Sequence, residues 1–162
     1  MSMSMRVNAK RKARGFSLIE VLIALLLLSI GLIAMAAMQT RSIQMNHSAY
    51  IASQASYLAY DMADRMRANR QAALAGQYNA DFGCQMPGGN SVAAEDIRDW
   101  LTAICGPNAE TPGLLPQQGA ITGGRIVQRA DDMIEIEVAW FDGRASGEGG
   151  EQVRSFLIEV QI

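Results

Sequence analysis

The chain has 162 residues, which allows one domain, or a small domain with an anchor. Hydrophobic residues make up 49% and charged residues 19%, a composition that excludes intrinsic disorder. The formal net charge of -2 does not suggest a general nucleic-acid binder, and one histidine with two cysteines excludes a Cys₄, Cys₂His₂ or His₃ zinc site within one chain.

The basic residues are concentrated at the start of the chain. Residues 1–15, MSMSMRVNAKRKARG, hold five of the 14 basic residues and no acidic residue. The rest of the chain carries nine basic side chains, 14 less five, against 16 acidic ones, a formal charge of -7. The chain is therefore a basic leader followed by an acidic body, and the cluster from Lys10 to Arg14 should be solvated.

An apolar segment follows, from Phe16 to Met38. Between Val21 and Met38, only Ser29 and Gly31 are not strongly apolar. At about 1.5 Å per helical residue this run spans about 27 Å, enough to cross most of a bilayer core. Because the basic cluster precedes the segment and only Arg41 follows closely, the positive-inside rule predicts a cytoplasmic N-terminus and a body outside the cytoplasm.

Residues 39–75 are predicted to continue the apolar segment, so that the two form one helix of about 50 residues. This stretch contains no proline and no glycine. Its apolar residues recur at steps of 4, 3, 4 and 4 and make one stripe of an amphipathic helix: Ile51, Ala55, Leu58, Met62 and Met66. Asp61 and Arg65 form an i,i+4 pair off this stripe, and Gly76 is the expected end of the helix.

Residues 76–162 are predicted to form an α+β head domain. Both cysteines and one helical segment, Ser91–Ile104, fall within residues 76–119. Ser91 is the expected N-cap, and Gly106-Pro107 follows the helix end. The expected buried face of this helix consists of Val92, Ile97, Trp100, Leu101 and Ile104.

The C-terminal part of the chain has the alternating pattern of β-strands. Strands are predicted at 125–128, 133–140 and 156–162, with a turn at 129–132 and a glycine-rich loop at 142–150. The second strand alternates Ile134, Ile136, Val138 and Trp140 with Glu135 and Glu137. The last strand alternates Phe156, Ile158, Val160 and Ile162 with Glu159 and Gln161. The sequence therefore predicts a small antiparallel sheet that packs on the polar half of the long helix.

The two cysteines, Cys84 and Cys105, are the ends of one short loop. Outside the cytoplasm a disulfide between them is expected, and the chain-entropy model gives it about 3 kcal/mol of stabilisation. Two free thiols, one of them regulatory, or unpaired buried cysteines are the alternatives.

No nucleophile arrangement, metal-ligand spacing or cofactor motif is visible, so neither a metal nor a cofactor is expected and the chain is predicted to be no enzyme. His47 is expected to be a surface or interface residue.

The junction between leader and apolar segment reads Arg14-Gly15-Phe16-Ser17-Leu18-Ile19-Glu20. A carboxylate near the middle of a membrane span costs about 2.5–3.5 kcal/mol on insertion scales. The cost for Glu20 is smaller, because it lies near the cytoplasmic end, but the charge still needs a partner. Cleavage after Gly15 would create one, a free amine on Phe16 of a neighbouring copy.

This junction resembles the class III signal of type IV prepilins and type II secretion pseudopilins, in which G-F-S-L-I-E precedes an apolar stretch. The resemblance implies that the prepilin peptidase/methyltransferase cuts after Gly15 and N-methylates Phe16, and that Glu20 acts in assembly. It implies an inner-membrane location with a periplasmic C-terminal domain, followed by incorporation into a pilus on the cell surface. It also implies a pilin-like α+β fold of four parts: a cleaved leader (1–15), a transmembrane and assembly helix (16–38), an amphipathic helix (39–75) and the head (76–162).

Within that family, the run from Ala94 to Trp100, followed by Leu114-Leu115-Pro116 and a glycine, resembles the type IV pilus modification minor pilin (PilV type). Asp96 and Trp100 match its A-x-D-x-x-x-W stretch. The resemblance implies a minor pilin that primes pilus assembly and influences adhesion and twitching motility. The implied partners are other minor pilins and the major pilin, and a tip adhesin is a further candidate.

Other interpretations stay open. A minor pseudopilin of a type II secretion system shares the N-terminal motif. A membrane-anchored periplasmic binding module, or an ordinary uncleaved anchor, would leave Gly15 and Glu20 without a purpose. A secretory signal peptide cut near Ala34-Met35-Ala36 would make Glu20 an odd choice in its apolar region. A DNA-binding pilin would use Arg65, Arg67 and Arg70, but the acidic body makes nucleic acid an unexpected partner.

Overall fold

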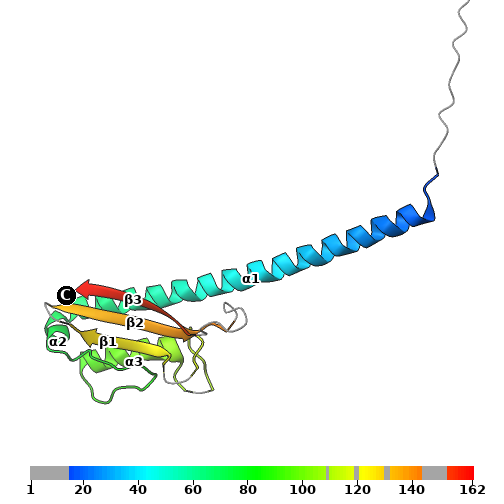
Figure 1. Cartoon of the computed structure of the whole chain (residues 1–162). Helices are drawn as coiled ribbons and strands as arrows, with labels where there is room; N and C mark the ends of the chain where they lie inside the picture. Colours follow the sequence, from blue (N-terminus) through cyan, green and yellow to red (C-terminus); the bar gives the residue numbers. More distant parts are fainter. Residues whose placement is uncertain (1–14, 109, 119–120, 130–131, 144–152) are drawn as a thin grey trace, which may run out of the picture. The chain divides into compact units, whose positions relative to one another are not determined.

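The computed structural model describes residues 15–108, 110–118, 121–129, 132–143 and 153–162. The predicted leader up to residue 14, the middle of the predicted 129–132 turn and most of the 142–150 loop lie outside these residues. The chain divides after Arg41 into two compact units, each described by itself below. In the described residues, three helices are followed by three strands, which is the predicted α+β, pilin-like architecture of a long N-terminal helix and a small C-terminal sheet (Figure 1).

Helix α1 runs from Leu18 to Ala68 and has 51 residues. Three hydroxyl groups of α1 donate to a backbone carbonyl one turn earlier: Ser29 to that of Leu25, Thr40 to that of Ala36 and Ser53 to that of Ala49. Every residue from Leu18 to Arg41 is exposed.

The predicted end of this helix at Gly76 is wrong, because the helix breaks at Asn69. Asn69 leaves the helical conformation with φ -116° and ψ 47°, and its side-chain amide donates to the hydroxyl of Tyr78. A short helix, α2, then runs from Arg70 to Leu74, and Gly76 follows with φ 73°. A polar side chain with a partner outside the helix therefore ends α1 before glycine does.

The predicted apolar stripe of α1 forms one wall of the head's core. Its five members are buried, together with Ala59 and Ala63 between them. They belong to a single hydrophobic cluster that also takes side chains from helix α3 and from the sheet. Burial of this stripe, rather than helix propensity, fixes the second half of α1 on the head.

Helix α3 spans Val92–Cys105. As predicted, Ser91 caps it by accepting a hydrogen bond from the Ala94 amide at 3.2 Å, and Gly106 ends it with φ 93°. Four of the five predicted core residues are buried, but Val92 is 61% exposed. Val92 is the first helical residue and lies off the buried face of α3. In this first turn, Ala93 and Ala94 are the buried residues.

The sheet is antiparallel with the order β1-β2-β3. Strand β1 spans Gly123–Gln128, β2 spans Met133–Phe141 and β3 spans Val153–Gln161. The strands at both edges begin earlier than predicted, β1 at Gly123 and β3 at Val153. A side chain on Gly124 would overlap the Trp100 ring, so glycine lets this part of β1 lie close against α3. The predicted inward face of β2 is buried from Ile134 to Trp140.

The outward face of β2 is more covered than the sequence suggests. Glu135 is 7% exposed, because Arg125 and Arg129 lie over it at 3.3 Å and 2.7 Å. Arg125 also pairs with Glu137 at 3.1 Å. The alternating sequence pattern correctly predicted that both glutamates lie on the outward face of β2. There, however, Glu135 is surrounded by arginine side chains rather than by water.

Candidate assembly site at the start of helix α1

The residues of the junction motif lie directly before and within the first turn of α1. Gly15 has no atom within 4 Å of where a side chain would stand, and Phe16 is 83% exposed. The carbonyl of Ser17 accepts hydrogen bonds from the amides of Glu20 and Val21 at 3.1 Å and 3.2 Å. The Gly15–Phe16 peptide bond is therefore an accessible bond shortly before a regular helix.

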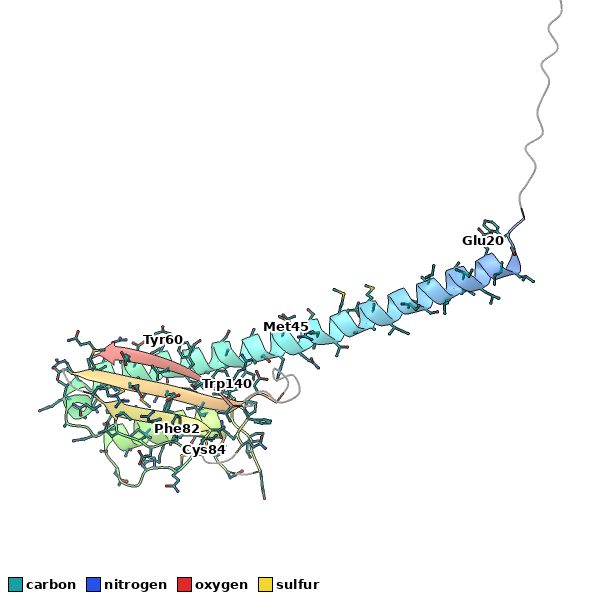
Figure 2. All side chains as sticks on the ribbon, in the orientation of Figure 1. Glu20, Met45, Tyr60, Phe82, Cys84 and Trp140 are labelled. Carbon is teal, nitrogen blue, oxygen red and sulfur yellow. A yellow bond between two sulfur atoms is a disulfide. The ribbon has the colours of Figure 1, made fainter. Side chains whose placement is uncertain are left out.

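Glu20 is the acidic residue in the first turn of α1, and it is exposed (Figure 2). Ser17 and Glu20 have the spacing of a capping box, S-x-x-E. Among the residues that the structure describes, however, no hydrogen bond or ion pair engages the Glu20 carboxylate. The positive end of the helix dipole favours a carboxylate here by about 0.3–1 kcal/mol, which leaves its charge available to a group on another molecule.

The segment after the motif presents an unbroken apolar surface. Within the described part of the chain, α1 is the one helix long and apolar enough to cross a membrane, and its apolar window is not buried in the protein. Leu18, Leu25 and Ile33 are 85%, 55% and 71% exposed, and other large side chains of the segment are similar. Such a surface needs a lipid bilayer or other apolar helices around it.

In the head, Asp96 connects α3 to α1. Its carboxylate accepts hydrogen bonds from Arg65 on α1 at 3.3 Å and from the hydroxyl of Tyr78. Arg65 also bonds Asp61 at 2.9 Å, so the predicted i,i+4 pair is one arm of a larger network. Burial, followed by the hydrogen bond to Asp96, raises the pKa of Tyr78 to about 12.

Trp100, one turn after Asp96 on α3, makes a second connection to α1. The Trp100 ring is 1% exposed, and its Nε1–H donates to the carbonyl of Leu58 at 2.9 Å. The sequence motif singled out Asp96 and Trp100 as a family resemblance, and the structure gives both a physical role. Their i,i+4 spacing puts both polar atoms on the α3 face that meets α1.

The three arginines considered for DNA binding have carboxylate partners. Arg65 pairs with Asp61 and Asp96, Arg67 with Asp64 at 2.7 Å, and Arg70 with Asp132 at 4.0 Å. These partners offset the positive potential that a nucleic-acid phosphate would need.

Cys84 and Cys105 form a disulfide, as expected, with 5.9 Å between their Cα atoms. The bond ties the loop before α3 to the last residue of that helix. Asp142, the first residue of the predicted 142–150 loop, is only 7% exposed, and it accepts a hydrogen bond from Ser48 of α1 at 3.2 Å. Nothing in the local sequence around Asp142 signals this contact, because its partner is 94 residues away. His47 is exposed on α1.

Two family models match the chain. Residues 10–36 match the prokaryotic N-terminal methylation motif, and residues 37–87 match the family described as type IV pilin Tt1218. Neither match reaches the segment from Ala94 to Trp100 on which the PilV-type resemblance rests. No curated protein and no solved structure matches the chain. The methylation motif implies processing by a prepilin peptidase. Pilin families consist of structural, non-enzymatic proteins. The two matches together support the interpretation of the chain as a type IV pilin.

Proposed function

We propose that the chain is a minor pilin of a type IV pilus. The observation that carries this proposal is the accessible Gly15–Phe16 bond directly before α1, with Glu20 in the first turn and an exposed apolar helix behind it. The N-terminus is cytoplasmic and residues 16–38 cross the inner membrane. Residues 39–75 carry the amphipathic part of the helix into the head, residues 76–162, which is periplasmic before assembly.

Processing removes residues 1–15 and makes the assembly group. Hydrolysis of the Gly15–Phe16 bond leaves a carboxylate on Gly15 and a free amine on Phe16, which the methyltransferase then methylates. An α-amine has a pKa of about 8, so it is largely cationic at neutral pH. In the fibre, the Glu20 carboxylate of one subunit meets this cation on a neighbour, in a site from which packed helices exclude water.

The finer role is to prime pilus assembly together with other minor pilins, with effects on adhesion and twitching motility. The Asp96–Trp100 segment supports this assignment, because it resembles the modification minor pilins. A tip adhesin and the major pilin are the further partners. The protein works through packing and one ion pair and carries out no catalysis itself.

The first test is the mass and N-terminal sequence of the chain, isolated from cells with and without the prepilin peptidase. A mature chain that begins at N-methylated Phe16 only in the presence of the peptidase supports the proposal. An unprocessed chain, or one cut near Ala36, overturns it in favour of an anchored or secreted module.

The second test replaces Glu20 by Gln. Removing one partner of a water-shielded ion pair costs about 3–5 kcal/mol, so the variant should be processed normally but recovered in pili at under about 1% of the wild-type amount. Glu159→Gln is the matched control, because Glu159 is an exposed glutamate of the head.

Deletion of the whole chain separates the two family roles. Loss of twitching supports a role in a type IV pilus, and loss of exoprotein secretion alone indicates a pseudopilin.

A further inference from the structure

The two edges of the sheet differ in how their backbone groups are used. At the β1 edge, the amide and the carbonyl of Ile126 both bond Ala80, each at 2.9 Å, and the amide of Gln128 donates to the Asn79 side chain at 2.9 Å. At the other edge, β3 pairs with β2 alone within the described part of the chain. The head therefore covers one edge of its sheet with its own chain and leaves the β3 edge open.

The hairpin of β1 and β2 fixes which residues of β3 face the open edge. The Arg129 amide bonds the Met133 carbonyl, so odd-numbered residues of β2 direct their backbone groups at β1 and even-numbered ones at β3. Even-numbered residues of β2 stand opposite even-numbered residues of β3, which are therefore the ones bonded to β2. The odd-numbered residues of β3 direct their amides and carbonyls away from the sheet: Val153, Ser155, Leu157, Glu159 and Gln161.

Strand β3 lacks the features that usually protect an open edge. It contains no lysine and no proline, and its register with β2 runs from Val153 to Gln161 without a bulge. Its two charged residues, Arg154 and Glu159, stand near its ends. With 9 residues at about 3.3 Å each, the open edge is about 30 Å long. Such an edge is a template for pairing with another strand.

Apolar side chains on both faces of this edge are left partly in water. On the inward face, Phe156 and Ile158 pack against the core but are only partly buried, and Tyr60, beside Phe156, is 54% exposed. On the outward face, Leu157 is 46% exposed. An added strand with apolar side chains next to them would remove this surface from water, while its backbone would bond the open amides and carbonyls.

Helix α1 runs in the same direction as β3 in the head (Figure 1). Ser48 bonds Asp142, which pairs with Arg154 near the start of β3. Tyr60, about three turns later on α1, lies beside Phe156 further along the strand. A strand that pairs antiparallel with β3 therefore also runs opposite to α1.

This direction excludes a closed pair of two copies at the β3 edge. A two-fold axis puts opposite side chains of two identical strands on the same face only when the strands are antiparallel. Antiparallel pairing of β3 with β3 of a second copy would point the two α1 helices in opposite directions. In the proposed topology, however, every copy enters the membrane in the same direction. The strand that fits this edge therefore belongs to another protein.

We propose that the open edge of β3 receives an extended strand of a different pilus protein during assembly. The strand lies beside β3, with its backbone bonded to the odd-numbered residues and with apolar side chains toward Phe156 and Tyr60. Main-chain hydrogen bonds supply affinity, and the apolar side chains supply the choice of partner. The proposal rests on the proposed pilin function and adds the kind of contact through which the head joins a neighbour.

Proline separates the open edge from the ladder within the head. Ser155→Pro removes an amide that points away from β2, so the edge loses a donor and gains a ring while the bonds to β2 remain. Ser155→Ala is the matched control, because it retains the amide. In cells that assemble pili, Ser155→Pro should be processed normally but recovered in pili at least about tenfold less than the wild type, and Ser155→Ala should be recovered like the wild type. Urea unfolding of the full chain shows whether each variant folds.

Hydrogen exchange of the wild-type chain tests the same contact without a variant. In detergent, the amides of Ser155, Leu157 and Glu159 should exchange at least about tenfold faster than those of Phe156 and Ile158, which bond β2. In isolated pili, the odd-numbered amides should slow to the rates of their neighbours. A short cross-linker on Ser155→Cys then identifies, by the mass of the adduct, the protein that lies at the edge.

The outcomes separate this proposal from the proposed function. If Ser155→Pro folds and is recovered in pili like the wild type, or if the odd-numbered amides exchange equally fast in detergent and in pili, the strand pairing is wrong while the pilin function stands. If Ser155→Pro does not fold, the exchange rates decide. An adduct between two copies of this chain also overturns the proposal. If the wild-type chain is neither processed nor recovered in pili, the proposed function itself fails.

Discussion

Replacing Tyr78 by Phe removes one hydroxyl from the network that joins α3 to α1. Tyr78 is 1% exposed, and its hydroxyl donates to Asp96 and accepts from the Asn69 amide at 3.2 Å. A hydrogen bond to a charged group contributes about 1.5–3 kcal/mol, and Arg65 still faces Asp96 in the variant. The expected loss at neutral pH is therefore about 2 kcal/mol in the free energy of unfolding.

The pKa of Tyr78 gives a second measure of how strongly the folded head favours the protonated hydroxyl. Burial and the hydrogen bond to Asp96 raise it from 10.0 to about 12. A group whose pKa is higher in the folded state contributes its full stabilisation below its unfolded pKa and loses it as the pH rises through the folded one. Two units correspond to about 3 kcal/mol, so the wild type should lose on the order of 2 kcal/mol between pH 10 and pH 12 and the rest outside this range.

Both numbers can be read from urea unfolding of the full chain in detergent, followed by tryptophan fluorescence. The only two tryptophans are Trp100 and Trp140, which are buried in the head, so the signal reports the head alone. Tyr57→Phe is the control, because Tyr57 is 65% exposed and should show neither effect. A Tyr78→Phe variant within about 0.5 kcal/mol of wild type, or one that retains the loss between pH 10 and pH 12, would refute the reasoning.

Three further predictions concern the head. Cys84→Ser should lower the free energy of unfolding by about 3 kcal/mol, and a reductant should lower that of the wild type, but not that of the variant, by a similar amount. Gly106→Ala should prevent accumulation of folded chain, because the residue has φ 93° and a Cβ would overlap the Thr111 carbonyl; Gly88→Ala, at an open position, should accumulate normally in the same expression assay. Trp100→Phe should cost about 1–3 kcal/mol in urea unfolding followed by circular dichroism, since it leaves the Leu58 carbonyl without its second, side-chain donor; an unchanged midpoint would mean that this hydrogen bond contributes nothing.

The elements that the sequence predicted correctly are those whose signal is local. Ser91 and Gly106 mark the ends of α3 through the chemistry of a cap and of a positive φ, and alternation placed the inward face of β2. The break of α1 at Asn69 was missed, because it depends on a hydrogen bond to Tyr78, nine residues later and outside the helix. The junction motif was visible because it is a short linear sequence.

The contacts that the sequence could not predict join residues far apart in the chain. Arg65 and Asp96 are 31 residues apart, and Ser48 and Asp142 are 94 apart. Each of these residues has an ordinary local interpretation as a solvated helix residue or a turn residue. Their selection as partners follows from the way α1, α3 and the sheet close around one core, which a periodic pattern does not encode.

The second half of α1 distributes its residues in a way that a soluble monomer does not require. Its core side uses small residues at successive turns, Ala55, Ala59 and Ala63, all fully buried, which allow the neighbouring elements to approach the helix closely. Its outer side carries Tyr50 and Tyr57, which leave more than half of their surface in water. A helix selected only for solubility would place charges there, because large exposed aromatic residues favour association. Tyr50 and Tyr57 therefore give the outer side of this half of α1 the exposed aromatic surface that is typical of an association surface.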